Sequence, residues 1–183
     1  MRIDKARELA QEYSKDDSDR WIRLQRVAAL AGNLAETIIT NPTDGETLVK
    51  AAWLHDIGRS PQLAKTGLYA LDGAVFLEEN GEHKLALLVA NHSFSKEEAA
   101  LRGLSEEMEQ FHYSRDLLSE CLTYCDLSID QRGKRLVLTD RVTDVLEQFG
   151  PNSVIAAALS QSLPEIQDIF TTVETLVRQY ASL

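Results

Sequence analysis

The chain is short of positive charge. Its 183 residues include 19 Lys and Arg against 29 Asp and Glu, which gives a formal net charge of −10. A general nucleic-acid binder needs a basic surface that displaces counterions from phosphates, so the composition argues against a nucleic-acid partner. A small phosphorylated molecule needs only a few local cations and stays a candidate partner.

Cysteines and long apolar runs are also scarce. Cys121 and Cys125 are the two cysteines, and their i, i+4 spacing stacks them on one helix face. We expect core thiols there rather than a disulfide or a metal pair. No stretch is long and apolar enough to span a bilayer, and the charged N-terminal segment does not read as a signal peptide. These absences predict a cytoplasmic protein without a membrane partner.

Apolar residues recur at helical spacing along most of the chain, and 44% hydrophobic composition at this length suffices for one good core. We predict an all-α fold, a compact single-domain helical bundle with an N-terminal helix in residues 1–17, a main domain in 18–150 and C-terminal helices in 151–183. The helices are expected at residues 3–13, 20–39, 46–56, 71–77, 83–93, 97–103, 114–126, 139–149, 152–162 and 164–180. Pro164 is expected in the first turn of the last helix, and residues 128–138 as a loop or small hairpin.

The stretch Ala-Ala-Trp-Leu-His-Asp-Ile-Gly-Arg at residues 51–59 brings His55 and Asp56 side by side at the end of an apolar helix, which Gly58 is expected to stop. An unpaired charge in apolar surroundings costs several kcal/mol, so these groups need partners. A divalent metal is one such partner and a salt bridge is another. The simplest alternative is that Asp56 caps the next turn and His55 is an ordinary buried histidine.

Three further stretches follow in order: Thr-Gly-Leu-Tyr-Ala-Leu-Asp-Gly-Ala at 66–74, Leu-Val-Ala-Asn-His-Ser at 88–93 and Leu-Thr-Tyr-Cys-Asp-Leu at 122–127. Together with residues 51–59 they resemble the HD-domain superfamily of metal-dependent phosphohydrolases, all-helical proteins named after the His-Asp pair. The resemblance covers residues 18–150 and implies a helical fold with a metal-dependent hydrolase site.

The resemblance also implies a ligand set. Members of this superfamily bind a metal through a histidine on the helix before the pair, through the pair itself and through a distant aspartate. His55, Asp56 and Asp126 match the last three, and His92 matches a further ligand of two-metal relatives. Imidazole and carboxylate suit a divalent ion such as Mn, Fe, Mg or Ni, and a metal-bound water becomes a nucleophile near neutral pH.

Two histidines of the family pattern are missing. Arg23 stands where the first ligand is expected, no histidine precedes His55, and Tyr69 stands where two-metal relatives carry another histidine. A guanidinium beside two carboxylates supplies fixed positive charge and can replace the missing ion, so a site without metal is one interpretation. The other interpretation is that Arg23 points to solvent.

Two functions follow from these residues. The first is hydrolysis of a small phosphate ester or nucleotide with a bound metal, where Asp56 and Arg23 act in catalysis. Arg59, Lys65 and Tyr69 would then lie near the substrate. The second is a catalytically degenerate HD-domain protein that binds a small ligand or a protein partner without turnover. A purely structural role is a third possibility, but it leaves the surviving ligand residues unexplained.

Overall fold

The computed structural model describes residues 1–180, and within them the chain is helical, with no β-strand. This confirms the all-α prediction. The elements are α1 (Ile3–Tyr13), α2 (Ser18–Thr37), α3 (Pro42–Leu54), the 3-10 turn η1 (Ile57–Arg59), α4 (Tyr69–Glu79), α5 (His83–Ala90), α6 (Ser95–Arg102), α7 (Ser105–Glu109), α8 (Leu117–Leu127), α9 (Leu138–Phe149) and α10 (Val154–Tyr180). The short helix α7 was not expected from the sequence.

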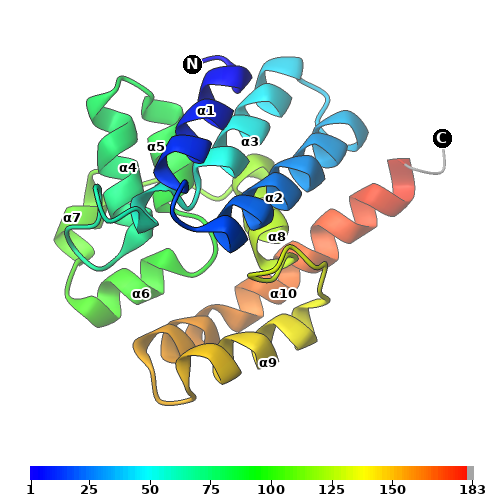
Figure 1. Cartoon of the computed structure of the whole chain (residues 1–183). Helices are drawn as coiled ribbons and strands as arrows, with labels where there is room; N and C mark the ends of the chain where they lie inside the picture. Colours follow the sequence, from blue (N-terminus) through cyan, green and yellow to red (C-terminus); the bar gives the residue numbers. More distant parts are fainter. Residues whose placement is uncertain (181–183) are drawn as a thin grey trace.

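Helix α8 lies at the centre of the bundle. It contacts α2, α3 and α5 on one side and α10 on the other (Figure 1). Nine of its eleven residues are buried. Cys121 and Cys125 are among them and both are free thiols, which confirms the prediction of core cysteines. Because α8 is enclosed on several sides, a polar side chain in its last turn must find its partner in the protein interior.

Side chains at the helix starts explain where several helices begin. The carboxylate of Asp17 accepts a hydrogen bond from the backbone N–H of Arg20 at the start of α2. Asn41 caps α3 in the same way, with Pro42 at the first helical position. The expected start of α3 at residue 46 was therefore wrong, because the Asn-Pro pair begins the helix a turn earlier.

The turn after α3 packs directly against α4. Helix α3 ends at Leu54, so Asp56 lies beyond it, in contrast to the expected helix through residue 56. A Cβ atom on Gly58 would lie 2.1 Å from the carbonyl oxygen of Tyr69 and 2.5 Å from the backbone nitrogen of Gly73. Glycine at position 58 therefore allows this close backbone contact, which fixes the His-Asp turn on the first turn of α4.

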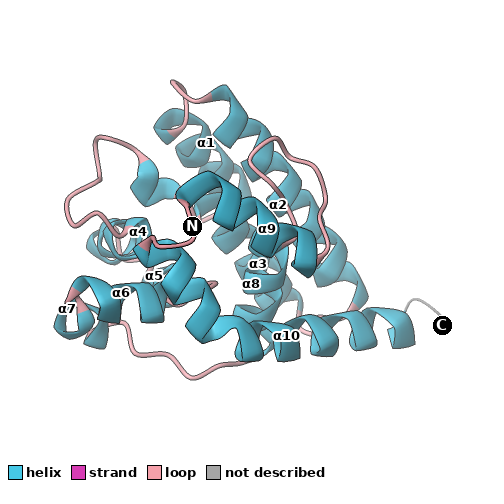
Figure 2. Ribbon diagram, turned by 90° about the horizontal axis from the view of Figure 1, so that it is seen from below, coloured by secondary structure: helices cyan, strands magenta, loops and turns pink. Residues whose placement is uncertain are grey.

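The C-terminal region differs from the sequence prediction. Two helices were expected, divided before Pro164, but residues 154–180 form the single helix α10 with Pro164 inside it. Proline removes a backbone donor from a helix, yet the buried residues on both sides of it continue the same face, among them Leu159, Ile166 and Phe170. Packing of that face outweighs the local cost, and the helix changes direction along its length (Figure 2).

Residues 128–137 form a loop, as predicted, with one isolated bridge between Ile129 and Arg135. The loop leads from α8 to α9, which lies against α10 (Figures 1 and 2). Among residues 1–180, no helix combines the length and the apolar character required to cross a membrane.

Alanine at position 58 tests the close contact between the turn and α4. We expect Gly58→Ala to lower the free energy of unfolding by about 3 kcal/mol, because its methyl group would meet backbone atoms that cannot move independently. Urea unfolding would measure this change. Gly32→Ala is the matched control, since a Cβ atom at this position in α2 has no neighbour within 4 Å. We expect it to be neutral or stabilising by about 0.5 to 1 kcal/mol, and equal effects of the two variants would contradict the packing argument.

Candidate functional site

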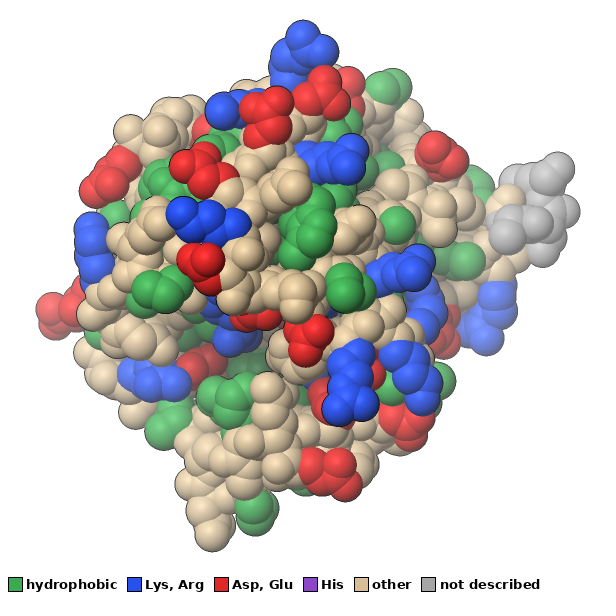
Figure 3. Space-filling view, viewed as in Figure 1, with side chains coloured by type: hydrophobic (Ala, Val, Ile, Leu, Met, Phe, Trp, Pro, Cys, Tyr) green, Lys and Arg blue, Asp and Glu red, His purple; other side chains and the backbone are tan. Residues whose placement is uncertain are grey.

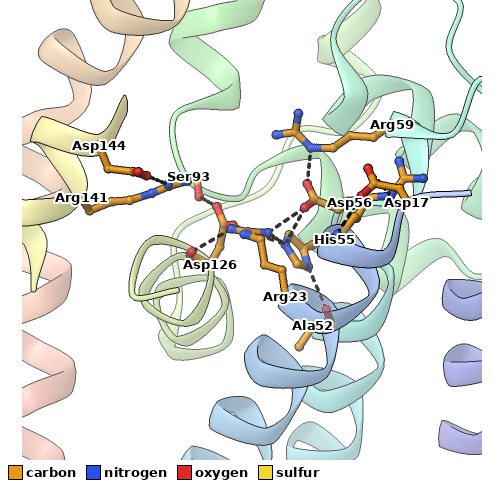
Figure 4. Close-up of polar contacts among 11 residues, drawn as sticks. Asp17, Arg23, Ala52, His55, Asp56, Arg59, Ser93, Asp126, Arg141 and Asp144 are labelled. Carbon is orange, nitrogen blue, oxygen red and sulfur yellow. Dashed lines mark hydrogen bonds and ion pairs between the residues drawn. The ribbon is translucent and has the colours of Figure 1, made fainter. Parts of the chain in front are cut away.

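Three helices end at the same place in the interior. His55 and Asp56 follow α3, His92 follows α5, and Asp126 lies in the last turn of α8. Arg23 reaches them from α2 (Figure 4). All five residues are buried, with at most 3% of their surface exposed. No histidine is visible on the face of the molecule shown in Figure 3. The fold therefore brings together the four ligand candidates and the arginine that replaces the first histidine.

The guanidinium of Arg23 binds all three groups of the predicted His-Asp-Asp set. Its Nη1 lies 2.7 Å from Oδ2 of Asp56 and 2.9 Å from Nε2 of His55. Its Nη2 donates to the backbone carbonyl of Asp126 at 2.9 Å and also to the Asp126 carboxylate. Arg23 does not point to solvent.

His55 is oriented by the end of its own helix. Its Nδ1 lies 2.8 Å from the carbonyl oxygen of Ala52, to which it donates, so Nε2 carries the lone pair that accepts from Arg23. The same Nε2 lies 3.3 Å from Oδ1 of Asp126 and 3.5 Å from Oδ2 of Asp56. The imidazole and both carboxylates thus direct acceptor atoms at one point, and the guanidinium lies there.

Asp56 has a second cation, Arg59. The Nε atom of Arg59 donates to Oδ1 of Asp56 at 2.7 Å, and its guanidinium lies 3.6 Å from the ring centre of Tyr69. Arg59 and Tyr69 therefore lie beside the site, where the sequence placed them. Lys65 does not, because its side chain is exposed and only its backbone N–H is held, by the carboxylate of Asp72.

Charge pairing overcomes burial at the two aspartates. Burial alone raises the pKa of the Asp126 carboxyl, but the Arg23 guanidinium holds that pKa well below its usual value. Burial likewise opposes ionisation of Asp56, whose pKa is lowered by the guanidinium groups of Arg59 and Arg23. The pKa of Arg23 is raised despite its own burial, because Asp126 and Asp56 favour its charged form. The centre is therefore ionised and internally paired.

His92 is the one predicted ligand that Arg23 does not contact. Its Nδ1 lies 2.6 Å from the carbonyl oxygen of Val89, and its ring centre lies 5.4 Å from that of His55 and 5.6 Å from that of Tyr69. Its Nε2 is buried and has no hydrogen-bond partner within residues 1–180. Burial lowers the pKa of His92, which leaves a neutral ring with a free acceptor atom.

Ser93 belongs to the site but had no assigned role in the sequence analysis. Its hydroxyl donates to Oδ2 of Asp126, and its backbone N–H donates to Oγ1 of Thr123 at 2.9 Å. Its φ of 59° lies in the left-handed region, which is uncommon for residues other than glycine. Two hydrogen bonds to α8 hold this conformation. It could not be predicted, since the sequence does not show that residue 93 meets α8.

A small pocket lies beside the centre and is covered by α9. Its volume is about 20 Å³, enough for roughly one water molecule. Arg141 of α9 enters this pocket from the side opposite to Arg59 (Figure 4). Arg141 was not among the residues predicted for the site, although it lies three residues after Leu138 and four before Val145, on the apolar stripe of its helix. The pocket is lined by Arg59, Tyr69, Phe94, Glu98, Asp126, Gln131, Arg141, Val145, Phe149 and Ile155.

The residues present do not fit a divalent ion in this arrangement. A metal needs the lone pairs of His55, Asp56 and Asp126 at once, and these lone pairs already accept hydrogen bonds from Arg23. Within the described part of the chain, no three His, Cys, Asp or Glu side chains are placed to hold a metal. The free Nε2 of His92 is a single donor atom and does not make a site by itself.

Comparison with known proteins gives one result. A family model described as HD domain matches residues 20–127, more than half of the chain, and spans Arg23, the His-Asp pair, His92 and Asp126. No curated protein and no solved structure gives a significant match. Helix α9 with Arg141 lies beyond the matched residues.

Replacing Arg23 by alanine tests its structural role. We expect Arg23→Ala to lower the free energy of unfolding by about 3 to 5 kcal/mol, because Asp126 would lose its only cation contact within the described residues. Thermal and urea unfolding would measure this loss. Arg26→Ala is the control, since Arg26 is exposed on the same helix and we expect a change of less than about 0.5 kcal/mol. Equal stability of the two variants would refute the role given to Arg23.

Proposed function

Because the chain belongs to the HD-domain family, a family of metal-dependent phosphohydrolases, we propose that it is a member in which Arg23 has replaced the metal and which binds a small ligand without hydrolysing it. The observation that supports this proposal is the position of the Arg23 guanidinium, within hydrogen-bond distance of His55, Asp56 and Asp126.

A guanidinium and a divalent metal meet the same demand for positive charge but differ in chemistry. A metal accepts a water molecule into its coordination sphere and lowers the pKa of that water toward 7. A guanidinium has only N–H donors and no position at which a water could be activated in this way. In Arg23 the Nη1 and Nη2 donors point at protein acceptors. The proposed centre therefore supports the fold and shapes the neighbouring pocket, but it does not generate a nucleophile.

A second candidate is hydrolysis with a bound divalent metal. The observation in its favour is the buried Nε2 of His92, which has no partner within residues 1–180 and matches a family ligand position. This candidate requires Arg23 to leave the carboxylates, and the incoming ion must then replace every hydrogen bond that Arg23 makes. Metal binding distinguishes the two candidates directly.

Calorimetric titration of the chelator-treated protein with Mn²⁺ tests the proposal. We expect no saturable binding to the wild-type chain. We expect Arg23→His to bind Mn²⁺ near-stoichiometrically, because it restores the histidine of the family pattern beside three existing ligands. That binding should disappear in the double variant Arg23→His, Asp56→Ala. Arg26→His is the control for an added surface histidine and should not bind.

A different set of results would support metal-dependent hydrolysis. Saturable Mn²⁺ binding to the wild-type protein that Asp56→Ala removes, together with Mn²⁺-stimulated release of phosphate from p-nitrophenyl phosphate, would reject the proposal in favour of the second candidate. Binding that persists in Asp56→Ala would point to surface carboxylates and would not support either candidate.

A further inference from the structure

The pocket between α9 and the centre contains an arginine with unsatisfied donors. Arg141 is 6% exposed, and within residues 1–180 its only side-chain partner is Asp144, which accepts from Nη1 at 2.5 Å. Its Nε is buried and has no hydrogen-bond partner in the described residues. A buried N–H donor of a charged group that lacks an acceptor costs free energy of folding. An acceptor on a bound ligand would satisfy this donor of Arg141.

Arg59 presents further donors from the opposite wall. Its Nε donates to Asp56, and its Nη atoms form no hydrogen bond or ion pair within residues 1–180. Its side chain is 35% exposed, so these atoms are accessible from solvent. The stacking of its guanidinium on Tyr69 holds the group in place. Two guanidinium groups thus face one small space, one of them fixed by an aromatic ring and the other by its burial.

The carboxylates of the same pocket do not use these donors. Asp126 is paired with Arg23, and Glu98 accepts from Arg102 at 2.7 Å. The donors of Arg59 and Arg141 that lack partners are therefore left for a ligand. Guanidinium groups bind carboxylate and phosphate oxygens through paired, charge-assisted hydrogen bonds. The chemistry of the polar side of the pocket is that of an oxyanion site.

The other side of the pocket is apolar. It is formed by four side chains: Phe94, Val145, Phe149 and Ile155. These apolar side chains make no favourable contact with a bare inorganic ion, but they would bury an aromatic or aliphatic group attached to the anion. Helix α9 buries only two residues, Arg141 and Val145, and both line this pocket. Val145 also belongs to the core, and Leu138, Val142 and Phe149 of α9 are partly buried against it.

We propose that Arg59 and Arg141 bind an organic oxyanion, a carboxylate or a phosphate that carries an apolar group, in the pocket under α9. This inference rests on the proposed ligand-binding function and names its ligand class. The pocket of about 20 Å³ is too small for such a ligand, so α9 must move outward on binding.

Phenyl phosphate and benzoate are suitable probes, with inorganic phosphate and acetate as their counterparts without an apolar group. Calorimetry at constant ionic strength should show that at least one aromatic probe binds the wild-type protein more tightly than its counterpart. Binding of phenyl phosphate alone assigns a phosphate ligand, and binding of benzoate alone assigns a carboxylate. Both results support the proposal.

Variants of Arg141 test which residue binds the anion. We expect Arg141→Ala to weaken binding of the active probe about tenfold or more, the effect of one charge-assisted hydrogen bond. Arg141→Lys keeps the charge but lacks Nε and should also weaken binding. Arg132→Ala removes the same charge from the exposed loop before α9 and should bind as the wild type does. Circular dichroism would verify that each variant is folded.

Two results would overturn the proposal. One is the absence of binding of either aromatic probe to the wild-type protein, and the other is unchanged affinity in the folded Arg141 variants. If the proposed metal-free function were wrong, the result would differ from both of these. The probe would then bind only when Mn²⁺ is added, and its affinity would still depend on Arg141.

Discussion

The interior of this protein depends on one cation, the guanidinium of Arg23, which lies between two buried carboxylates. Moving a charge out of water costs several kcal/mol, and only a well-placed partner of opposite charge offsets that cost. Asp56 and Asp126 come from segments 70 residues apart, yet both accept hydrogen bonds from the same guanidinium. The pairing therefore joins α2, the turn after α3 and the end of α8, and the remaining helices pack around that junction.

A guanidinium can replace a metal in the fold without replacing it in the chemistry. Both satisfy converging acceptor atoms, and both hold the aspartates ionised. The difference lies in direction, because a metal accepts lone pairs at one point from any side, whereas a guanidinium donates through fixed N–H bonds in one plane. Arg23 makes its contacts through Nη1 and Nη2, and its Nε is buried without a partner in the described residues. The exchange therefore satisfies the acceptors of the centre and leaves one donor unused.

Local patterns predicted much of this architecture. The 3.6-residue period located most helices, and the family resemblance implied that His55, Asp56, His92 and Asp126 belong to one site. The predictions were wrong or missing where tertiary packing determines the local structure. Pro164 is a local helix breaker, but the buried face of α10 continues past it. The backbone of Ser93 depends on α8, which lies 30 residues away in sequence.

The two arginines show what the sequence could and could not have indicated. Arg23 precedes Val27 by four residues and Ala31 by eight, so its helix places it on the buried face, and Arg141 is on the buried stripe of α9 in the same way. A charged residue on such a stripe needs an internal partner or an external one. Spacing cannot distinguish these cases, because the partners come from distant segments. Arg23 binds two buried carboxylates inside the chain, whereas Arg141 pairs with the single carboxylate of Asp144 within the described residues and lines the pocket under α9. This contrast separates an arginine that completes the fold from one suited to a ligand.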